Sequence, residues 1–224
     1  MANLIITIDG PAASGKSTIA RLLAEELGAD FLDTGAMYRA VTLAALGADI
    51  DMSDEEELLN VLNSSEFGFT CEKGKMKASL DGVDVTEQIR RTDVTANAHY
   101  VASAARLREK LVKMQRDFAA GREKIVTEGR DQGTVAFPNA DIKVFLTADA
   151  TERAKRRQAE LKAKEGEQKV QNVLKAIEKR DESDRSRDVG PLKPAPDAIV
   201  VDTTELTIEN VLEEILALVR DRGL

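Results

Sequence analysis

The sequence LIITIDGPAASGKSTIARLLAEEL, residues 4–27, reads as a buried strand, a glycine-bounded loop and an amphipathic helix in immediate succession. Gly10, Gly15, Lys16 and Ser17 fit the spacing G-x-x-x-x-G-K-[ST] of a phosphate-binding loop. The glycines let backbone N–H groups turn toward a di- or triphosphate, and the helix adds the positive end of its dipole. Lys16 is expected to reach the outer phosphates and Ser17 to hold Mg²⁺. The stretch therefore predicts a nucleoside triphosphate site.

The residues on either side of the loop carry this interpretation, because a pattern this short also occurs by chance. A β-branched run stands directly before Gly10, as expected for a buried strand. The apolar positions of the following helix recur at helical spacing up to Gly28, a residue that favours helix termination. Strand, loop and helix in this order are the context in which the motif binds phosphate.

Composition bounds the class of protein. The chain has 224 residues, of which 42% are hydrophobic, and this suits one large α/β domain or two small ones. The net charge of −8 does not favour a nucleic acid or an anionic membrane as partner. Cys71 is the only cysteine, and no apolar run approaches the length of a membrane span. Met1 begins no signal-peptide pattern, so we expect a cytoplasmic protein, and we expect it separately to be a monomer.

Four further apolar stretches predict strands of an α/β sheet that helices cover on both faces. Helical patterns separate these stretches, which lie at 29–33, 124–128, 142–146 and 198–201. A different pattern interrupts them at 67–86, where three short strands predict an antiparallel meander inserted into the chain. Asp81-Gly82, between the second and third of these strands, is a strong hairpin signal.

Two strands are followed by charged residues that the carboxyl edge of the sheet would display, where ligands bind in open sheets. One strand runs into Thr34, which we expect to cap the next helix, with Tyr38 and Arg39 just beyond it. Another strand runs into Arg130 and Asp131. Taken alone, a solvated arginine and a half-buried tyrosine would be the simpler interpretation of such residues.

A long helical stretch at 93–120, with a break near Ser103, carries His99 and Arg108. Its apolar stripe predicts one buried face. A lone histidine in such a helix is more often packed or solvated than a ligand.

The segment 153–187 differs in charge from the rest of the chain. It contains twelve Lys and Arg against seven Asp and Glu, within a chain of net charge −8. The pattern predicts two charged helices with a tip near Gly166. Helical spacing groups two sets of residues on helix faces: Arg153, Arg156 and Arg157, and then Arg180, Asp184 and Arg187. A solvated hairpin is one interpretation, and a mobile arginine lid over a triphosphate is the other.

Together these features predict a phosphoryl-transfer site, in which catalysis is mostly alignment and charge neutralisation. The arginines outnumber those that one triphosphate needs, because Lys16 and the loop amides already serve the donor. A second phosphate is therefore implied. If the acceptor is a phosphate monoester, its oxygen is largely ionised near neutral pH, so no general base is required.

Four motifs in this order resemble the signatures of bacterial cytidylate kinases, which are P-loop kinases of nucleoside monophosphates. The motifs are ITIDGPAASGKST, LDTGAMYRA, EGRDQGTVAFPNAD and RDESDRSRDVGPL, and the resemblance runs from Leu4 to the last helix. The meander at 67–86 is similar to the insert of these enzymes. The resemblance implies transfer of the ATP γ-phosphate to CMP or dCMP with Mg²⁺, and ATP and CMP or dCMP as small-molecule partners.

The resemblance also implies the fold. It predicts one α/β domain, residues 1–224, with the P-loop kinase fold: a five-stranded parallel sheet flanked by helices, an inserted monophosphate-binding subdomain and a helical lid. The implied regions are a core at 1–33, 104–150 and 190–224, an insert at about 34–103 and a lid at about 151–189.

Residue roles carry over by motif. The ATP-binding residues would be Gly10, Pro11, Ala12, Ala13, Ser14, Gly15, Lys16, Ser17 and Thr18, with Ser17 at the metal. The acceptor phosphate would be held by Arg39, Arg130 and Arg187, the sugar by Tyr38, Arg180 and Asp184, and the cytosine edge by Arg108 and Asp131. The catalytic residues would be Lys16, Arg130, Arg157 and Arg187.

Three positions of the substrate and donor sites depart from the family pattern. His99 stands where the family often has a small hydroxyl residue near the base. Thr34, also expected at the substrate, replaces a serine, and Ala13 replaces a common glycine of the loop.

Other functions are compatible with a phosphate-binding loop. A related kinase could act on UMP, shikimate or dephospho-coenzyme A, but the meander and the Gly-Arg-Asp turn argue against these acceptors. A P-loop switch would leave the acceptor-side arginines unexplained, and no Asn-Lys-x-Asp motif for guanine is present. A nucleic-acid role for the basic hairpin is weakened by the acidic total charge.

Overall fold

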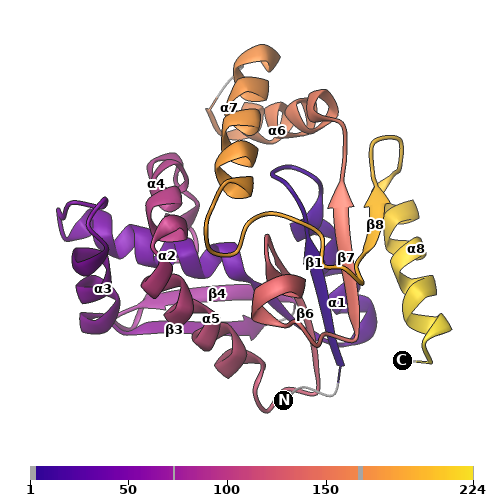
Figure 1. Ribbon diagram of the computed structural model, residues 1–224, viewed down its shortest axis with the longest axis horizontal. Helices are drawn as coiled ribbons and strands as arrows, with labels where there is room; N and C mark the ends of the chain where they lie inside the picture. Colours follow the sequence, from indigo (N-terminus) through magenta and orange to yellow (C-terminus); the bar gives the residue numbers. More distant parts are fainter. Residues whose placement is uncertain (1–3, 73, 166–168, 224) are drawn as a thin grey trace.

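The computed structural model describes residues 4–72, 74–165 and 169–223 (Figure 1). Its strands are β1 Leu4–Asp9, β2 Asp30–Asp33, β3 Phe67–Glu72, β4 Lys75–Leu80, β5 Val83–Asp84, β6 Lys124–Gly129, β7 Ile142–Thr147 and β8 Ile199–Asp202. Its helices are α1 Lys16–Leu27, α2 Thr34–Gly47, α3 Glu55–Ser64, α4 Thr92–Ser103, α5 Ala105–Ala119, α6 Ala150–Glu165, α7 Val170–Arg185 and α8 Ile208–Asp221. Two short turns complete the set, the 3₁₀ turn η1 Gln88–Arg90 and the π-helical turn η2 Gln132–Ala136.

The central sheet has five parallel strands in the order β2-β6-β1-β7-β8, which confirms the predicted P-loop kinase architecture. The register places Asp9 of β1 beside Gly129 of β6, and Asp33 of β2 beside Glu128 of β6. Since the strands are parallel, the loops that follow β1, β2 and β6 leave the sheet at one edge. The site residues that were predicted to follow these strands are therefore close together at this edge of the sheet.

Alternate side chains of the strands pack against helices on opposite faces of the sheet. Ile5 and Ile125 pack with residues of α2 and α5 on one face. Ile6 and Val126 pack with residues of α1 and α8 on the other. Both faces are thus buried, and the apolar runs of the strands follow from this burial.

The meander forms a second, antiparallel sheet in the order β3-β4-β5. It lies against the edge strand β2, whose backbone N–H groups find sulfur acceptors there. Phe31 N donates to Cys71 Sγ at 3.3 Å, and Asp33 N donates to Met76 Sδ at 3.2 Å. The third strand stops at Asp84 and not at 86 as predicted, because the Asp84 carboxylate accepts the Thr86 N–H at 2.8 Å and turns the chain.

The helical segments lie above and beside the carboxyl edge of the sheet. The predicted break in the long helix falls at Ala104, between α4 and α5. Helices α6 and α7 stand above the ends of β1 and β7, in the salmon and orange part of Figure 1. The tip expected near Gly166 lies outside the described residues. Within the described ranges, the helices are all too short or too polar to cross a membrane.

Candidate active site

The phosphate-binding loop joins β1 to α1 and depends on two glycines. Gly10 has a φ of 149°, and a methyl group there would overlap the carbonyl oxygen of Leu146 on β7. Gly15 has a φ of 90° and immediately precedes the first residue of α1. Both values lie in the region that L side chains rarely adopt. The loop conformation therefore requires the glycines of the motif.

Lys16 is buried at the centre of this loop. Its ammonium group donates to the carbonyl oxygen of Pro11 at 2.6 Å and to Ser14 Oγ at 3.4 Å. Burial lowers the pKa of Lys16 to about 7, and the nearby positive charge of Arg130 lowers it further, against the opposing effect of Glu128. An anion in the loop would restore the charged form, since an opposite charge raises the pKa of an amine.

Ser17, the predicted metal ligand, lies at the start of α1 and reaches across to β6. Its hydroxyl group donates to Glu128 Oε1 at 2.6 Å. Burial raises the pKa of Glu128, and the neighbouring Asp33 raises it as well. Sequence reasoning did not assign Glu128 to the site, although its place at the end of a core strand was a signal.

These oxygen atoms fit Mg²⁺, which binds through one or two protein oxygens together with substrate phosphates and water. Among the described residues there is no cluster of three or more His, Cys, Asp or Glu side chains that could hold a metal by themselves. The Ser17 and Glu128 oxygens would therefore form a Mg²⁺ site together with the oxygens of a bound phosphate.

Asp9 links the phosphate loop to the turn after β6. It is 4% exposed, and its two carboxylate oxygens accept the N–H groups of Gln132 at 2.9 Å and Gly133 at 2.8 Å. Burial raises the pKa of Asp9 to about 7, against the lowering effect of these two hydrogen bonds. The turn that carries Arg130 and Asp131 is therefore held to the residue directly before Gly10. Sequence reasoning gave Asp9 no role.

The helix after β2 begins at Thr34, one residue earlier than it would if Thr34 were its N-cap. Asp33 is the N-cap of α2, and its Oδ1 accepts the Ala36 N–H at 2.9 Å. The prediction that Thr34 caps the helix is wrong, because Thr34 is the first helical residue and its hydroxyl donates to the carbonyl oxygen of Glu128 at 2.7 Å. Asp33 Oδ2 also accepts Arg39 Nη2 at 3.1 Å, so the cap holds an arginine at the carboxyl edge.

Asp184 near the end of α7 contacts two of the arginines that were predicted for the acceptor phosphate. Arg130 Nε donates to Asp184 Oδ2 at 2.8 Å, and Arg187 Nη2 lies 3.5 Å from Asp184 Oδ1. Arg180, one turn earlier on α7, is exposed but close enough to interact with the charges of Arg130 and Asp184. Residues predicted from two distant motifs thus form one cluster, in which guanidinium groups outnumber carboxylates.

Arg108 and Asp131, predicted to read the base, form a buried ion pair. Arg108 also donates to the Ala102 carbonyl oxygen at 3.1 Å and lies 5.4 Å from the centre of the Tyr38 ring. Burial raises the pKa of Tyr38 to about 12, which keeps its hydroxyl group neutral. Gly190 packs directly on the pair, since a methyl group there would overlap Asp131 Oδ2 and Arg108 Nη2. Sequence reasoning missed Gly190, although it lies in the last quoted motif.

The sequence profile of the cytidylate kinase family matches residues 6–221, the span that holds the loop, the arginine cluster and the buried ion pair. The chain belongs to this family. Its members are kinases, and the predicted family resemblance is confirmed. The cytidylate kinase of Caldicellulosiruptor bescii is 46% identical over 97% of this chain and 96% of its own length. The cytidylate kinase of Rhodopirellula baltica is 47% identical over 97% of this chain and 93% of its own length.

Solved structures place this cytidylate kinase family member in the P-loop kinase fold. The shikimate kinase from Acinetobacter baumannii, determined in complex with shikimate, is similar with a TM-score of 0.50 and 14% identity. The match covers 99% of this chain and 95% of that protein. At such low identity the likeness concerns the fold alone, and it carries no information about the acceptor.

Two further predicted residues of this cytidylate kinase family member lie on α6 and α4. Arg157 on α6 pairs with Glu160 at 2.9 Å and is close enough to Arg180 to interact with its charge. His99 on α4 has Nδ1 at 2.8 Å from the Ala96 carbonyl oxygen and lines a hollow of about 380 Å³ together with Met52. The structure therefore brings Arg157 toward the site but does not bring His99 to Arg108 and Asp131.

Helices α6 and α7 dock on the phosphate loop of this cytidylate kinase family member through a buried ion pair. Arg153 Nη1 lies 2.6 Å from Asp181 Oδ2 and donates to the Ala12 carbonyl oxygen at 3.0 Å. Asp181 Oδ1 accepts the Ala12 N–H at 3.2 Å. Ala13, with a φ of 58°, packs against the apolar cluster of Val173 and Ile177 between these helices. The loop and the helices above it are thus directly connected.

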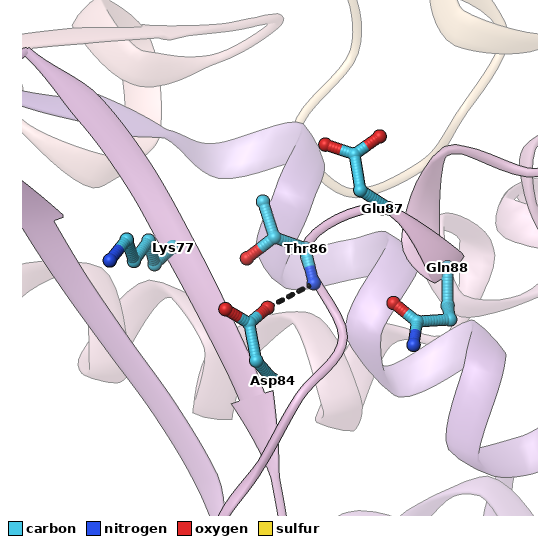
Figure 2. Close-up of a pocket in the computed structure, with 5 residues that line it drawn as sticks. All are labelled: Lys77, Asp84, Thr86, Glu87 and Gln88. Carbon is cyan, nitrogen blue, oxygen red and sulfur yellow. Dashed lines mark hydrogen bonds between the residues drawn. The ribbon is translucent and has the colours of Figure 1, made fainter.

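A second hollow, of about 490 Å³, lies on the meander side of the molecule. Figure 2 shows its lining, which comprises Lys77, Asp84, Thr86, Glu87 and Gln88. Lys77 lies on β4, Asp84 on β5 and Gln88 on η1, and the other two lie in the link between β5 and η1. The hollow lies outside the phosphate loop and the arginine cluster, and it borders the turn that ends at Arg90.

Proposed function

We propose that this protein transfers the γ-phosphate of ATP to CMP or dCMP and produces ADP and CDP or dCDP. The observation that carries the proposal is the presence of two phosphate-binding arrangements on one sheet edge. The loop around Lys16 is the first, and the guanidinium groups of Arg130 and Arg187 at Asp184 are the second. Membership of the cytidylate kinase family supports a cytidine nucleotide as acceptor.

The donor part of the proposal assigns ATP to the loop. Backbone N–H groups of the residues from Gly10 to Thr18, except Pro11, would surround the β- and γ-phosphates, and Lys16 would neutralise charge on the transferred group. The proximity of Arg157 to Arg180 supports its assignment to the same group, beside Arg130 and Arg187. Together, these positive charges would align and stabilise the transferring phosphoryl group.

The acceptor phosphate is assigned to Arg39, Arg130 and Arg187. Each of these guanidinium groups is held by a carboxylate, Asp33 or Asp184, so its direction is fixed before the acceptor binds. A dianionic phosphate would share these arginines with the carboxylates through charge-assisted hydrogen bonds. The attacking oxygen of CMP is already ionised near neutral pH, so the reaction needs no proton acceptor from the protein.

Base recognition is assigned to the buried pair of Arg108 and Asp131. Asp131 would accept the N4 amino group of cytosine, and Arg108 would donate to its ring nitrogen or carbonyl oxygen. Uracil would present an oxygen to the carboxylate, and such a mismatch costs about 1–3 kcal/mol per unpaired buried group. The contact predicted for His99 stays a prediction that requires α4 to shift.

The remaining acceptor assignments concern the sugar and the start of α2. Tyr38 and Arg180 would lie at the ribose with Asp184. Thr34, whose hydroxyl group bonds to the Glu128 carbonyl oxygen, would line the wall between the acceptor and β6. The burial of Tyr38 and the proximity of Arg180 to Asp184 support these positions.

Mg²⁺ is the proposed cofactor, and Ser17 and Glu128 are the residues that would hold it. When bound, the ion would neutralise negative charge on the phosphate oxygens of ATP. Glu128 would act from the end of β6 and so add a carboxylate to the serine of the motif.

The proposed organisation has a core, an insert at about 34–103 and a lid at about 151–189 that close over the two nucleotides and exclude water. The contacts of Arg153 and Asp181 with Ala12 support a lid that is hydrogen-bonded to the phosphate loop. We further propose a cytoplasmic monomer whose partners are small nucleotides and not nucleic acids.

The decisive experiment is a side-by-side measurement of ADP release from Mg²⁺-ATP. The acceptors are CMP, dCMP, UMP, AMP, shikimate and none, with Lys16→Ala as the inactive control. Acceleration by CMP and dCMP but not by the others supports the proposal. Acceleration by UMP or shikimate would assign another acceptor, and slow release that is indifferent to all of them would indicate a P-loop switch.

A further inference from the structure

The carboxylate of Asp33 holds two guanidinium groups that come from different parts of the chain. Oδ2 lies 3.1 Å from Arg39 Nη2 and 3.9 Å from Arg90 Nη2. Arg39 belongs to α2, whereas Arg90 ends η1, the turn that follows the meander. Asp33 is 5% exposed. One buried carboxylate at the carboxyl edge thus connects the meander segment to the acceptor side of the site.

The Asp33 carboxylate does not satisfy both of the guanidinium groups that it faces. One carboxylate faces two guanidinium groups, and its other oxygen already accepts the Ala36 N–H. The Arg90 contact, at 3.9 Å, is too long for a hydrogen bond, so the Asp33 carboxylate holds this guanidinium group only weakly. The Arg90 side chain is 45% exposed, against 19% for Arg39. Of the two arginines, Arg90 has the freer access to a ligand.

The turn that carries Arg90 has room on its far side. Glu87 and Gln88, three and two residues before Arg90, line the hollow of about 490 Å³ shown in Figure 2. The wall of η1 that faces Lys77 and Asp84 is therefore not packed against other side chains. Ile89 of the same turn is 1% exposed and packs in the core with residues of α2, so the turn is anchored and the long Arg90 side chain is the part that would move.

We propose that Arg90 is a further ligand of the acceptor phosphate. The segment after the meander supplies this arginine, and Asp33 holds its guanidinium group near the position of the phosphate. The inference rests on the proposed function, because it takes a nucleoside monophosphate as the ligand. A dianionic phosphate beside Arg39 offers Arg90 shorter and stronger hydrogen bonds than the distant carboxylate does. Through Arg90, the segment after the meander would contact the phosphate of the acceptor and not its base.

The chain offers a matched control in the next residue. Arg91 is also exposed, but it pairs with Asp93 at 2.6 Å on the first turn of α4. We expect Arg90→Ala to raise KM for CMP about tenfold or more, as for loss of a charge-assisted hydrogen bond, with KM for ATP unchanged. Arg91→Ala should stay within about twofold of the wild type, and Arg90→Lys should recover part of the loss.

A comparison of CMP with cytidine separates phosphate binding from a structural role. Calorimetric titration of Arg90→Ala should show the weakened affinity for CMP but wild-type affinity for cytidine, which lacks the phosphate. Equal CMP affinity in the Arg90→Ala and Arg91→Ala variants would overturn the inference, as would an equal loss for cytidine and CMP. If the wild type does not turn over CMP, the proposed function fails. The titrations then still decide whether Arg90 binds the phosphate.

Discussion

The Ser17 hydroxyl group and Glu128 Oε1 are joined by a 2.6 Å hydrogen bond between the phosphate loop and the end of β6. Glu128 is 6% exposed, and burial raises its pKa. A buried carboxylate beside a phosphate loop is costly unless a cation or hydrogen-bond donors stabilise its charge. The hydrogen bond therefore marks the position at which a Mg²⁺ ion would join loop and strand.

Glu128→Gln keeps the size of the side chain and removes its charge. We expect kcat to fall by about 10- to 100-fold and the Mg²⁺ concentration for half-maximal rate to rise, with little change in KM for CMP. Titration of Mg²⁺ at fixed ATP and CMP measures both effects. Glu25→Gln, on the exposed face of α1, is the control. An unchanged Mg²⁺ dependence in Glu128→Gln would remove this residue from the proposed metal site.

Lys16 should take up a proton when ATP binds. Its pKa of about 7 in the free protein leaves it mostly neutral at pH 8.5, and the bound phosphates should raise the pKa well above that pH. Calorimetry of ATP binding at pH 8.5 in buffers of different ionisation enthalpy measures the proton count. We expect close to one proton for the wild type and close to none for Lys16→Arg, whose guanidinium group is always charged. Equal counts in the two proteins would contradict the lowered pKa.

Arg153 and Asp181 should hold α6 and α7 on the phosphate loop. The pair is buried, so Asp181→Asn leaves the Arg153 charge without its partner and should cost about 3–5 kcal/mol of stability. We expect a lower Tm and faster trypsin cleavage within 153–187, and slower cleavage in the wild type when ATP and CMP are both present. Glu178→Gln, at an exposed position of α7, should behave as the wild type. Unchanged cleavage in Asp181→Asn would mean that other contacts dock the helices.

The sheet, the meander and the phosphate loop could be predicted because local patterns encode them. Apolar runs set the strands, turn residues set the meander, and the loop motif requires glycines that the φ values of Gly10 and Gly15 explain. The cap of α2 could not be decided in this way. Asp33 and Thr34 are both good N-cap residues, and only the Ala36 N–H contact shows which one caps the helix.

The residues that sequence reasoning missed act through contacts between distant parts of the chain. Asp9 accepts an N–H group 123 positions away, and Ser17 reaches a carboxylate 111 positions away. No periodicity or motif spacing records such a pairing, because it depends on the register of β1 beside β6. Helical spacing and the carboxyl-edge position predicted Arg180, Asp184, Arg187 and Arg130 as charged residues of the site, whereas the family resemblance supplied their individual roles. The role that the resemblance gives His99 at the base stays a prediction, and in this structure His99 lines a hollow together with Met52.

Gly190 should control base selectivity through its contact with Arg108 and Asp131. Gly190→Ala forces a methyl group into the pair at a backbone φ of 61°, so the pair must separate or the turn must move. Gly121→Ala is a matched control, because Gly121 has a φ of 80° with no atom in the way of a methyl group. Both variants should lose about 1–2 kcal/mol from the strained backbone, and urea titration measures this loss.

Gly190→Ala alone should also raise KM for CMP, by about tenfold for each buried hydrogen bond that is lost, and lower the ratio of kcat/KM for CMP to that for UMP. Gly121→Ala should keep the wild-type ratio. The two variants share the backbone cost and differ only in the overlap with the pair. A lost preference for cytosine in Gly190→Ala therefore has to come from displacement of Arg108 and Asp131, and an intact preference would place base recognition on other residues.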